Sequence, residues 1–148
     1  MEENKTIQQV EEEIIEEFSF LDSWDDKYEY IIDIGKKLPD LEEKYKVEEN
    51  TVKGCQSTVW LVSSYENGKV YFKADSNTVI TKGLISMLVR VLSGHTPDEI
   101  IDAKLEFIHR IGMTTHLAQT RANGLLAMVK KMKTYALGYK AMQNIVSR

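Results

Sequence analysis

The sequence predicts an α+β fold in which a small antiparallel β-sheet packs against helices. Amphipathic helical patterns open the chain over residues 6–38, one β-hairpin pattern follows over 58–74, and helical patterns resume at residue 79. Strands grouped apart from helices in this way are typical of α+β domains, whereas regular alternation would indicate a parallel sheet. With 148 residues the chain has the length of one domain, which we expect to span residues 1–148.

The two N-terminal helices have clear start and stop signals. Thr6 and Gln9 form a capping-box pattern, and apolar residues then recur along one helical stripe as far as Phe18. Ser23 is the predicted N-cap of the second helix, because its hydroxyl can accept from a free backbone amide. Pro39 ends that helix, since the residue before a proline is pushed out of helical geometry.

The middle of the chain predicts a β-hairpin whose turn is Asn67-Gly68. Asn-Gly favours a type I′ turn because both central residues adopt positive φ, and β-branched and aromatic residues flank the pair on both sides. With these two residues as the loop, Trp60 pairs with Asp75 across the hairpin. The same register places the residues just before the first strand beside the segment 76–80, which follows the second strand.

Further helices follow the hairpin. Residues 79–93 are apolar almost all the way round, which predicts a buried helix that Gly94 ends. Thr96 starts another helix with a capping box, residues 105–113 carry a short helical pattern, and the last helix begins near residue 118. The apolar residues expected on the buried side of the last helix are Leu125, Met128, Val129, Met132 and Leu137.

Composition and charge exclude several function classes. No apolar run approaches the ~18 residues that cross a membrane, and the acidic N-terminus shows no apolar signal segment, so we expect a cytoplasmic protein without a membrane partner. Residues 1–50 hold 17 acidic and 6 basic side chains, and residues 51–148 hold 6 acidic and 13 basic ones. No Lys/Arg cluster is interleaved with aromatic residues, so this polarity indicates protein partners and not nucleic acid.

Cys55 is the candidate residue for covalent chemistry. The chain has no Gly-rich phosphate loop and no zinc-protease motif, and its single cysteine excludes a disulfide framework and a multi-cysteine metal site. We interpret His95, His109 and His116 as ordinary histidines and not as metal ligands, because only the step from 109 to 116 matches a helical spacing.

Two interpretations of Cys55 are open. A lone cysteine is commonly a small buried hydrophobe. However, Cys55 lies in a polar segment, where Gly54 permits a tight turn and Lys53 would lower the thiol pKa if its ammonium pointed toward the sulfur. These features favour a presented nucleophile. Because no base is adjacent in the sequence, we expect a partner to activate it.

The residues around Cys55 resemble the signature of the SufE family, the sulfur-acceptor proteins of iron–sulfur cluster assembly. The resemblance covers residues 20–130. The residues that carry it are Val52 to Leu61 around the cysteine; Trp24, Lys27, Tyr28, Ile31, Ile32, Gly35, Leu38 and Pro39; Asp75, Ser76, Ile80, Lys82, Gly83 and Leu84; and His116, Leu117, Arg121, Gly124, Leu125, Ala127 and Met128. One departure is Ala118-Gln119-Thr120, where the family often has Ser/Thr-Pro-Ser before the arginine, so Thr120 is left as the candidate cap.

The resemblance implies a fold similar to that of the IscU-type scaffolds and a role as a sulfur carrier. Cys55 would accept sulfur as a persulfide from a pyridoxal-phosphate-dependent cysteine desulfurase of the SufS or CsdA type, stimulate its turnover, and pass the sulfur to a SufBCD-type scaffold. The chain would be a covalent carrier and not an enzyme, with no cofactor or metal of its own. A second copy, in a weak homodimer, is a further expected partner.

Five residues are expected to support the cysteine loop or to meet the partner. They are Lys53, Gly54, Gln56, Asp75 and Arg121. Two other functions compete with the carrier. A cysteine hydrolase would pair Cys55 with one of the three histidines, and a pure adaptor would stimulate the desulfurase without carrying sulfur.

Overall fold

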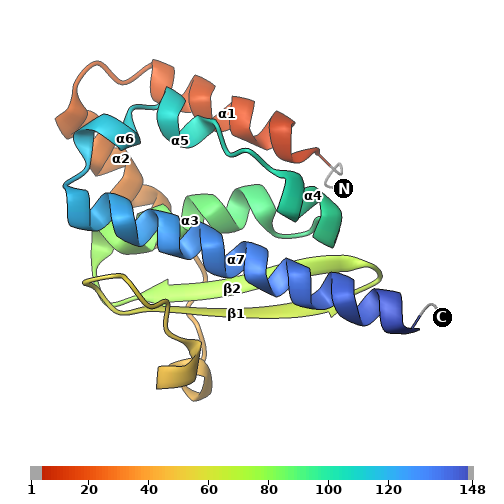
Figure 1. The fold of residues 1–148 in the computed structure, drawn as a ribbon. Helices are drawn as coiled ribbons and strands as arrows, with labels where there is room; N and C mark the ends of the chain where they lie inside the picture. The colour runs from red at the N-terminus through yellow and green to blue at the C-terminus, as the bar shows by residue number, and fades with distance from the viewer. Residues whose placement is uncertain (1–4, 147–148) are drawn as a thin grey trace.

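Helices pack on one face of a single hairpin in residues 5–146, the part of the chain that the computed structural model describes (Figure 1). In chain order the elements are α1 (Ile7–Ser19), α2 (Trp24–Lys36), the short 3-10 turns η1 (Glu43–Tyr45) and η2 (Glu48–Asn50), β1 (Val59–Glu66), β2 (Lys69–Ser76), α3 (Val79–Leu92), α4 (Pro97–Asp102), α5 (Phe107–Arg110), α6 (Met113–His116) and α7 (Gln119–Val146). Helix α3 contacts α1, α2, β2 and α7. This arrangement confirms the α+β prediction. No helix among the described residues is both long enough and apolar enough to cross a membrane.

The hairpin has the predicted turn and register. Asn67 and Gly68 have φ values of 52° and 79°, as a type I′ turn requires. Trp60 lies opposite Asp75, and every pair from β1 and β2 follows from this register. The inward-facing residues of β2 alternate with exposed ones, so one face of the hairpin covers the core while the other meets solvent.

The predicted helix caps are formed. The Thr6 hydroxyl accepts from the Gln9 amide at 3.0 Å, and the Gln9 side chain accepts from the Thr6 amide at 2.9 Å. The Ser23 hydroxyl accepts from the Asp26 amide at 3.1 Å at the start of α2. That helix ends at Lys36, ahead of the proline that was expected to stop it. Local side-chain chemistry therefore fixes where both N-terminal helices begin.

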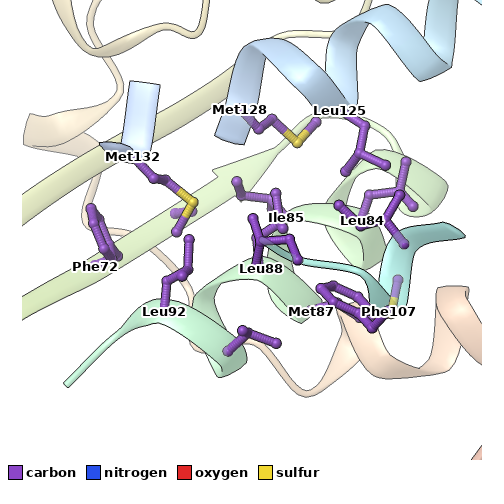
Figure 2. Close-up of a cluster of buried hydrophobic side chains, with 14 of the residues drawn as sticks. Phe72, Leu84, Ile85, Met87, Leu88, Leu92, Phe107, Leu125, Met128 and Met132 are labelled. Carbon is purple, nitrogen blue, oxygen red and sulfur yellow. The ribbon is translucent and has the colours of Figure 1, made fainter. Parts of the chain in front are cut away.

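A continuous hydrophobic core joins α3 to α7 and β2 (Figure 2). Ten of the fourteen residues of α3 are buried, as predicted for a helix that other elements cover on nearly all sides. The labelled side chains that meet there are Phe72 from β2, Leu84, Ile85, Met87, Leu88 and Leu92 from α3, Phe107 from α5, and Leu125, Met128 and Met132 from α7. Each contributes about 1.5–3 kcal/mol through burial, so this core is the main source of stability.

Helix α7 begins near the predicted residue, but its buried side differs from the prediction at one position. Leu125, Met128 and Met132 are buried as expected. The prediction for Leu137 is wrong, because its side chain is 54% exposed while Ala136 is fully buried. Steps of three and four residues from 125 lead through 128 and 132 to 136, which leaves 137 on the outer face of the helix.

A corner between α5 and α7 redirects the chain. Gly112 has φ of 90°, and this left-handed residue separates α5 from α6 within the stretch that carries the short helical pattern. At the end of α6, His116 stacks on Trp24 of α2, with ring centroids 4.4 Å apart. The aromatic contact therefore fixes the corner against α2 immediately before α7 begins.

The backbones of α2 and α3 approach each other at two glycines. A Cβ atom on Gly83 would lie 2.1 Å from the carbonyl oxygen of Ile31, and one on Gly35 would lie 2.7 Å from the backbone nitrogen of Gly83. Neither distance is compatible with a real side chain, so the absence of both side chains permits this packing. The contact places the first turns of α3 where they line the candidate site.

We predict that Gly83→Ala lowers the free energy of unfolding by about 3 kcal/mol or more, because the added methyl group must push two backbones apart. Urea unfolding of the intact chain measures the change. Gly138→Ala is the matched control: this glycine also lies inside a helix, but a Cβ there meets nothing within 4 Å. The control should gain roughly 0.5–1 kcal/mol from helix propensity. A small gain for both variants would contradict the close approach.

Candidate functional site

The cysteine loop, residues 53–58, is closed at its base. The Val52 amide donates to the Val59 carbonyl at 2.8 Å. On α7, the Lys131 ammonium donates to the Thr51 carbonyl at 2.8 Å. The two ends of the loop are therefore fixed beside each other, and the first end is also fixed to α7.

The C-terminal half of the cysteine loop is tied to the segment after β2. The Thr58 amide donates to the side-chain oxygen of Asn77 at 3.0 Å, and the Asn77 amide donates to the Thr58 carbonyl at 3.2 Å. The hydroxyls of Ser57 and Thr78 lie 2.9 Å apart. These bonds confirm the prediction from the hairpin register that residues 76–80 lie beside this loop.

The tip of the cysteine loop, residues 54–56, is held much more weakly than its base. Within the described residues, no backbone–backbone hydrogen bond joins residues 53–57 to another segment. Gly54 has φ of 96°, a left-handed conformation that favours glycine at this turn. The Cys55 thiol donates to the carbonyl of Gly124 on α7, with a sulfur–oxygen distance of 3.5 Å. The tip is therefore held by side-chain contacts and can move without breaking the base of the loop.

Cys55 is half-buried in the wall of a cavity of about 220 Å³ between the cysteine loop, α3 and α7. The residues that line this cavity are Cys55, Gln56, Ser57, Thr81, Leu84, Ala118, Thr120, Arg121, Gly124 and Met128. Leu84 and Met128 also belong to the core shown in Figure 2. The apolar side of the cavity is therefore continuous with the core, which fixes its shape.

Burial controls the protonation of the resting thiol. Removal from water raises the pKa of Cys55, because the thiolate is the charged form. The bond to the Gly124 carbonyl also favours the protonated form, since it uses S–H as the donor. The condition for an effect of Lys53 on this pKa is not met in the structure, because its ammonium pairs with Glu48 and lies 2.9 Å from the Thr51 hydroxyl.

Gln56 and Arg121, two of the predicted site residues, line the cavity together with Cys55. Gln56 is exposed and Arg121 is half-buried. Within residues 5–146, the Arg121 side chain forms no hydrogen bond or ion pair, so its guanidinium is a positive charge without a carboxylate partner at the cavity wall. It lies in the first turn of α7, which begins one residue before Thr120, so that threonine is inside the helix and is not its cap.

Asp75 lies away from the cavity wall. It is 5% exposed, and its carboxylate oxygens lie 3.3 Å from the ammonium groups of Lys46 and Lys82. Burial opposes the charged form, but the Ser76 amide and these two lysines lower the pKa of Asp75. Asp75 thus ties the end of β2 to α3 and to the segment that precedes the cysteine loop, and any effect on Cys55 is indirect.

Gly124 and Ala127 form the surface of α7 on which the tip of the cysteine loop rests, and the sequence prediction gave them no role. Gly124 lies against Cys55, and Ala127 lies against Gly54. They are three residues apart and so lie on one helix face. Two small residues at this spacing, inside a stretch that resembles a family motif, are the signal that points to such a surface.

We predict that amides at residues 53–57 exchange hydrogen faster than those of β1. The strand amides to compare are the alternate ones of β1 that donate to β2 across the antiparallel pairing, whereas the amides of residues 53–57 have no backbone partner in another segment. Hydrogen exchange followed by mass spectrometry or NMR measures the difference. Equal protection of the loop and the strand would show that the tip is held rigidly.

We also predict that alkylation of Cys55 by iodoacetamide is slower in the folded chain than in the urea-unfolded chain near neutral pH. Alkylation requires the thiolate, and burial raises the pKa of the folded thiol, so the midpoint of its rate–pH profile lies at higher pH than in the unfolded chain. The unfolded chain is the control. A folded midpoint at or below the unfolded one would show that a positive charge governs the thiol.

Comparison with known proteins agrees with this fold and site. The SufE family model, described as an Fe–S metabolism associated domain, matches residues 12–136. An uncharacterized SufE-like protein of Rhizobium meliloti is 40% identical, over 86% of this chain and 94% of its own length. SufE-like protein 1, chloroplastic/mitochondrial, of Arabidopsis thaliana is 39% identical, over 85% of this chain and 34% of its own length.

A solved structure shows the same fold. The solution structure of a hypothetical protein from Thermus thermophilus matches with a TM-score of 0.72 and 19% identity, over 90% of this chain and 96% of that one. The family match covers most of the chain, and the relatives are similar along nearly all of it. The chain therefore belongs to the SufE family and has a role in Fe–S metabolism.

Proposed function

We propose that this protein accepts and carries sulfur for iron–sulfur cluster assembly, with Cys55 as the residue that bears the sulfur. Membership of the SufE family supplies the role in Fe–S metabolism. The observation that supports the finer function is the position of the thiol, half-buried beside a cavity on a weakly held loop tip. A thiol placed in this way can be presented to another protein and then withdrawn.

The proposed step is an exchange between a thiolate and a persulfide. The Cys55 thiolate attacks the outer sulfur of a persulfide on the partner, and a new S–S bond joins Cys55 to that sulfur. The old S–S bond breaks, and its electron pair leaves on the partner's cysteine as a thiolate. The proton that Cys55 gave up balances the proton that the released thiolate takes, so no external oxidant or reductant is consumed.

Family membership implies a cysteine desulfurase as the partner, and we propose one of the SufS or CsdA type. Docking has to activate the thiol, because burial keeps the resting Cys55 protonated. Moving the tip out of the cavity returns the sulfur to a polar environment, which brings its pKa back toward the ordinary value. Removal of the persulfide frees the desulfurase for another turnover. We propose a SufBCD-type scaffold as the next acceptor.

The cavity beside Cys55 is suited to shelter the loaded sulfur. Its volume of about 220 Å³ is several times that of one water-sized group, about 30 Å³, so one more sulfur atom fits without moving the core. Arg121 supplies an unpaired positive charge at the wall, toward which an anionic outer sulfur is attracted. Both features support the carrier over a surface thiol that happens to be reactive.

The two competing functions find less support. A cysteine hydrolase needs a base beside its thiol, and in the described part of the chain His95, His109 and His116 are not among the residues that line the cavity. A pure adaptor has no need for a sheltered thiol, and it predicts that Cys55→Ala stimulates a desulfurase as well as the wild type does.

Location and self-association stay predictions. We propose the cytoplasm as the compartment, as the sequence suggests, while the Arabidopsis thaliana relative is named as chloroplastic/mitochondrial. Cell fractionation with an antibody against the chain decides the compartment. The weak homodimer is checked by sedimentation over a range of concentrations.

We predict that incubation with a pyridoxal-phosphate-dependent cysteine desulfurase and free cysteine adds ~32 Da, the mass of one sulfur atom, to the intact protein, and that dithiothreitol removes it by thiol exchange. Intact-mass spectrometry measures both changes. Cys55→Ser should not load, because an alkoxide is not accessible at neutral pH, and prior alkylation should also block loading. A wild-type chain that stays unloaded with both desulfurase types would overturn the carrier function.

A further inference from the structure

The tip of the cysteine loop rests on a place where α7 lacks a side chain. A Cβ atom added to Gly124 would lie 3.3 Å from the Cys55 sulfur and 3.6 Å from its Cα atom. The first distance is shorter than the 3.5–4.0 Å at which carbon atoms pack comfortably, and sulfur is larger than carbon. Any side chain at this position therefore presses on Cys55.

Gly124 is not required by the backbone of α7. It lies inside a regular helix and is buried, and its φ is not in the left-handed region. Glycine at such a position costs about 0.5–1 kcal/mol relative to alanine. The helix is therefore less stable than it would be with alanine. Glycine is needed here because Cys55 occupies the space that a side chain at position 124 would fill.

Few other contacts keep Cys55 in that space. The base of the loop is held by Val52 and Val59, and its C-terminal half by Asn77. At the tip, the Cys55 thiol bonds to the Gly124 carbonyl at 3.5 Å, and the Gly54 backbone packs near Ala127. A steric clash between a side chain at position 124 and Cys55 is therefore relieved by movement of the tip and not by movement of the core.

We propose that Gly124 is a positioning residue that sets the balance between a seated Cys55, sheltered in the cavity, and a presented Cys55 that a partner can reach. The proposal deepens the carrier function and rests on it for its biological meaning. The missing side chain at position 124 permits the seated state. Because few contacts hold the tip, the presented state costs little free energy relative to the seated state. A larger residue at 124 shifts the balance toward presentation.

The test compares two matched series of variants, Gly124→Ala and Gly124→Val against Gly138→Ala and Gly138→Val. Both glycines lie in α7, but a Cβ on Gly138 meets nothing within 4 Å. We expect iodoacetamide to modify Cys55 faster in the position-124 variants, with Val above Ala and an increase of roughly tenfold for each unit by which the thiol pKa falls. The midpoint of the rate–pH profile moves to lower pH in the position-124 variants and stays at the wild-type value in the position-138 variants.

A stability measurement separates movement of the loop from damage to the fold. If the pressure falls on the Cys55 sulfur, Gly124→Ala is more favourable in a Cys55→Ala background than in the wild type, because the clashing atom is gone. The coupling is the difference between the two effects of Gly124→Ala on the free energy of unfolding. Urea unfolding of the wild type, Gly124→Ala, Cys55→Ala and the double variant measures it. Wild-type profiles for both position-124 variants, or no coupling between the two positions, would overturn the proposal.

Loaded protein supplies an independent readout. After the desulfurase is removed, Gly124→Ala should lose its added sulfur to dithiothreitol several-fold faster than the wild type or Gly138→Ala, since its sulfur spends more time outside the cavity. The two proposals fail separately. If no chain loads, the carrier function fails while alkylation still tests Gly124; if all chains load and lose sulfur alike, the role of Gly124 fails and the carrier stands.

Discussion

The enclosure of α3 is the constraint from which the rest of the structure follows. Its buried residues face the hairpin, α2 and α7 at once, and the approach to α2 is so close that Gly83 meets the backbone of Ile31. An apolar helix of this kind is stable in water only when other elements cover it. The positions of α2, β2 and α7 are therefore largely those that cover α3, and the cavity lies between the N-terminal parts of α3 and α7, beside the cysteine loop.

The candidate site combines a rigid wall with a weakly held tip. Leu84 and Met128 belong both to the core and to the cavity wall, so the wall is as fixed as the core itself. Across from them, Cys55 is held by one long bond to a carbonyl and by contacts with small residues. A carrier requires this contrast, because the shelter must keep its shape while the thiol enters and leaves it.

The uneven charge of the chain has a partly internal explanation. Arg90 of α3 lies 2.7 Å from Glu17 of α1, and Arg110 lies 2.6 Å from Glu12. Acidic residues of the first helix thus pair with basic residues from the second half of the chain and orient α1 on the core. Pairs this exposed contribute about 0–1 kcal/mol each, so they direct packing more than they stabilise it.

The sequence by itself determined most of the elements and singled out Cys55 as the candidate residue for covalent chemistry. Helix caps, the Asn-Gly turn and the register of the hairpin are local, because they depend on hydrogen bonds between near neighbours, and a single cysteine leaves one candidate thiol. Only the tertiary structure decided the surroundings of Cys55. The Lys53 ammonium pairs with Glu48, and the Asp75 carboxylate lies beside Lys46 and Lys82 instead of lining the cavity. Gly124 lies against Cys55 although the two are far apart in the sequence. Periodicity indicates which face of a helix is buried, but it does not say which atoms that face meets.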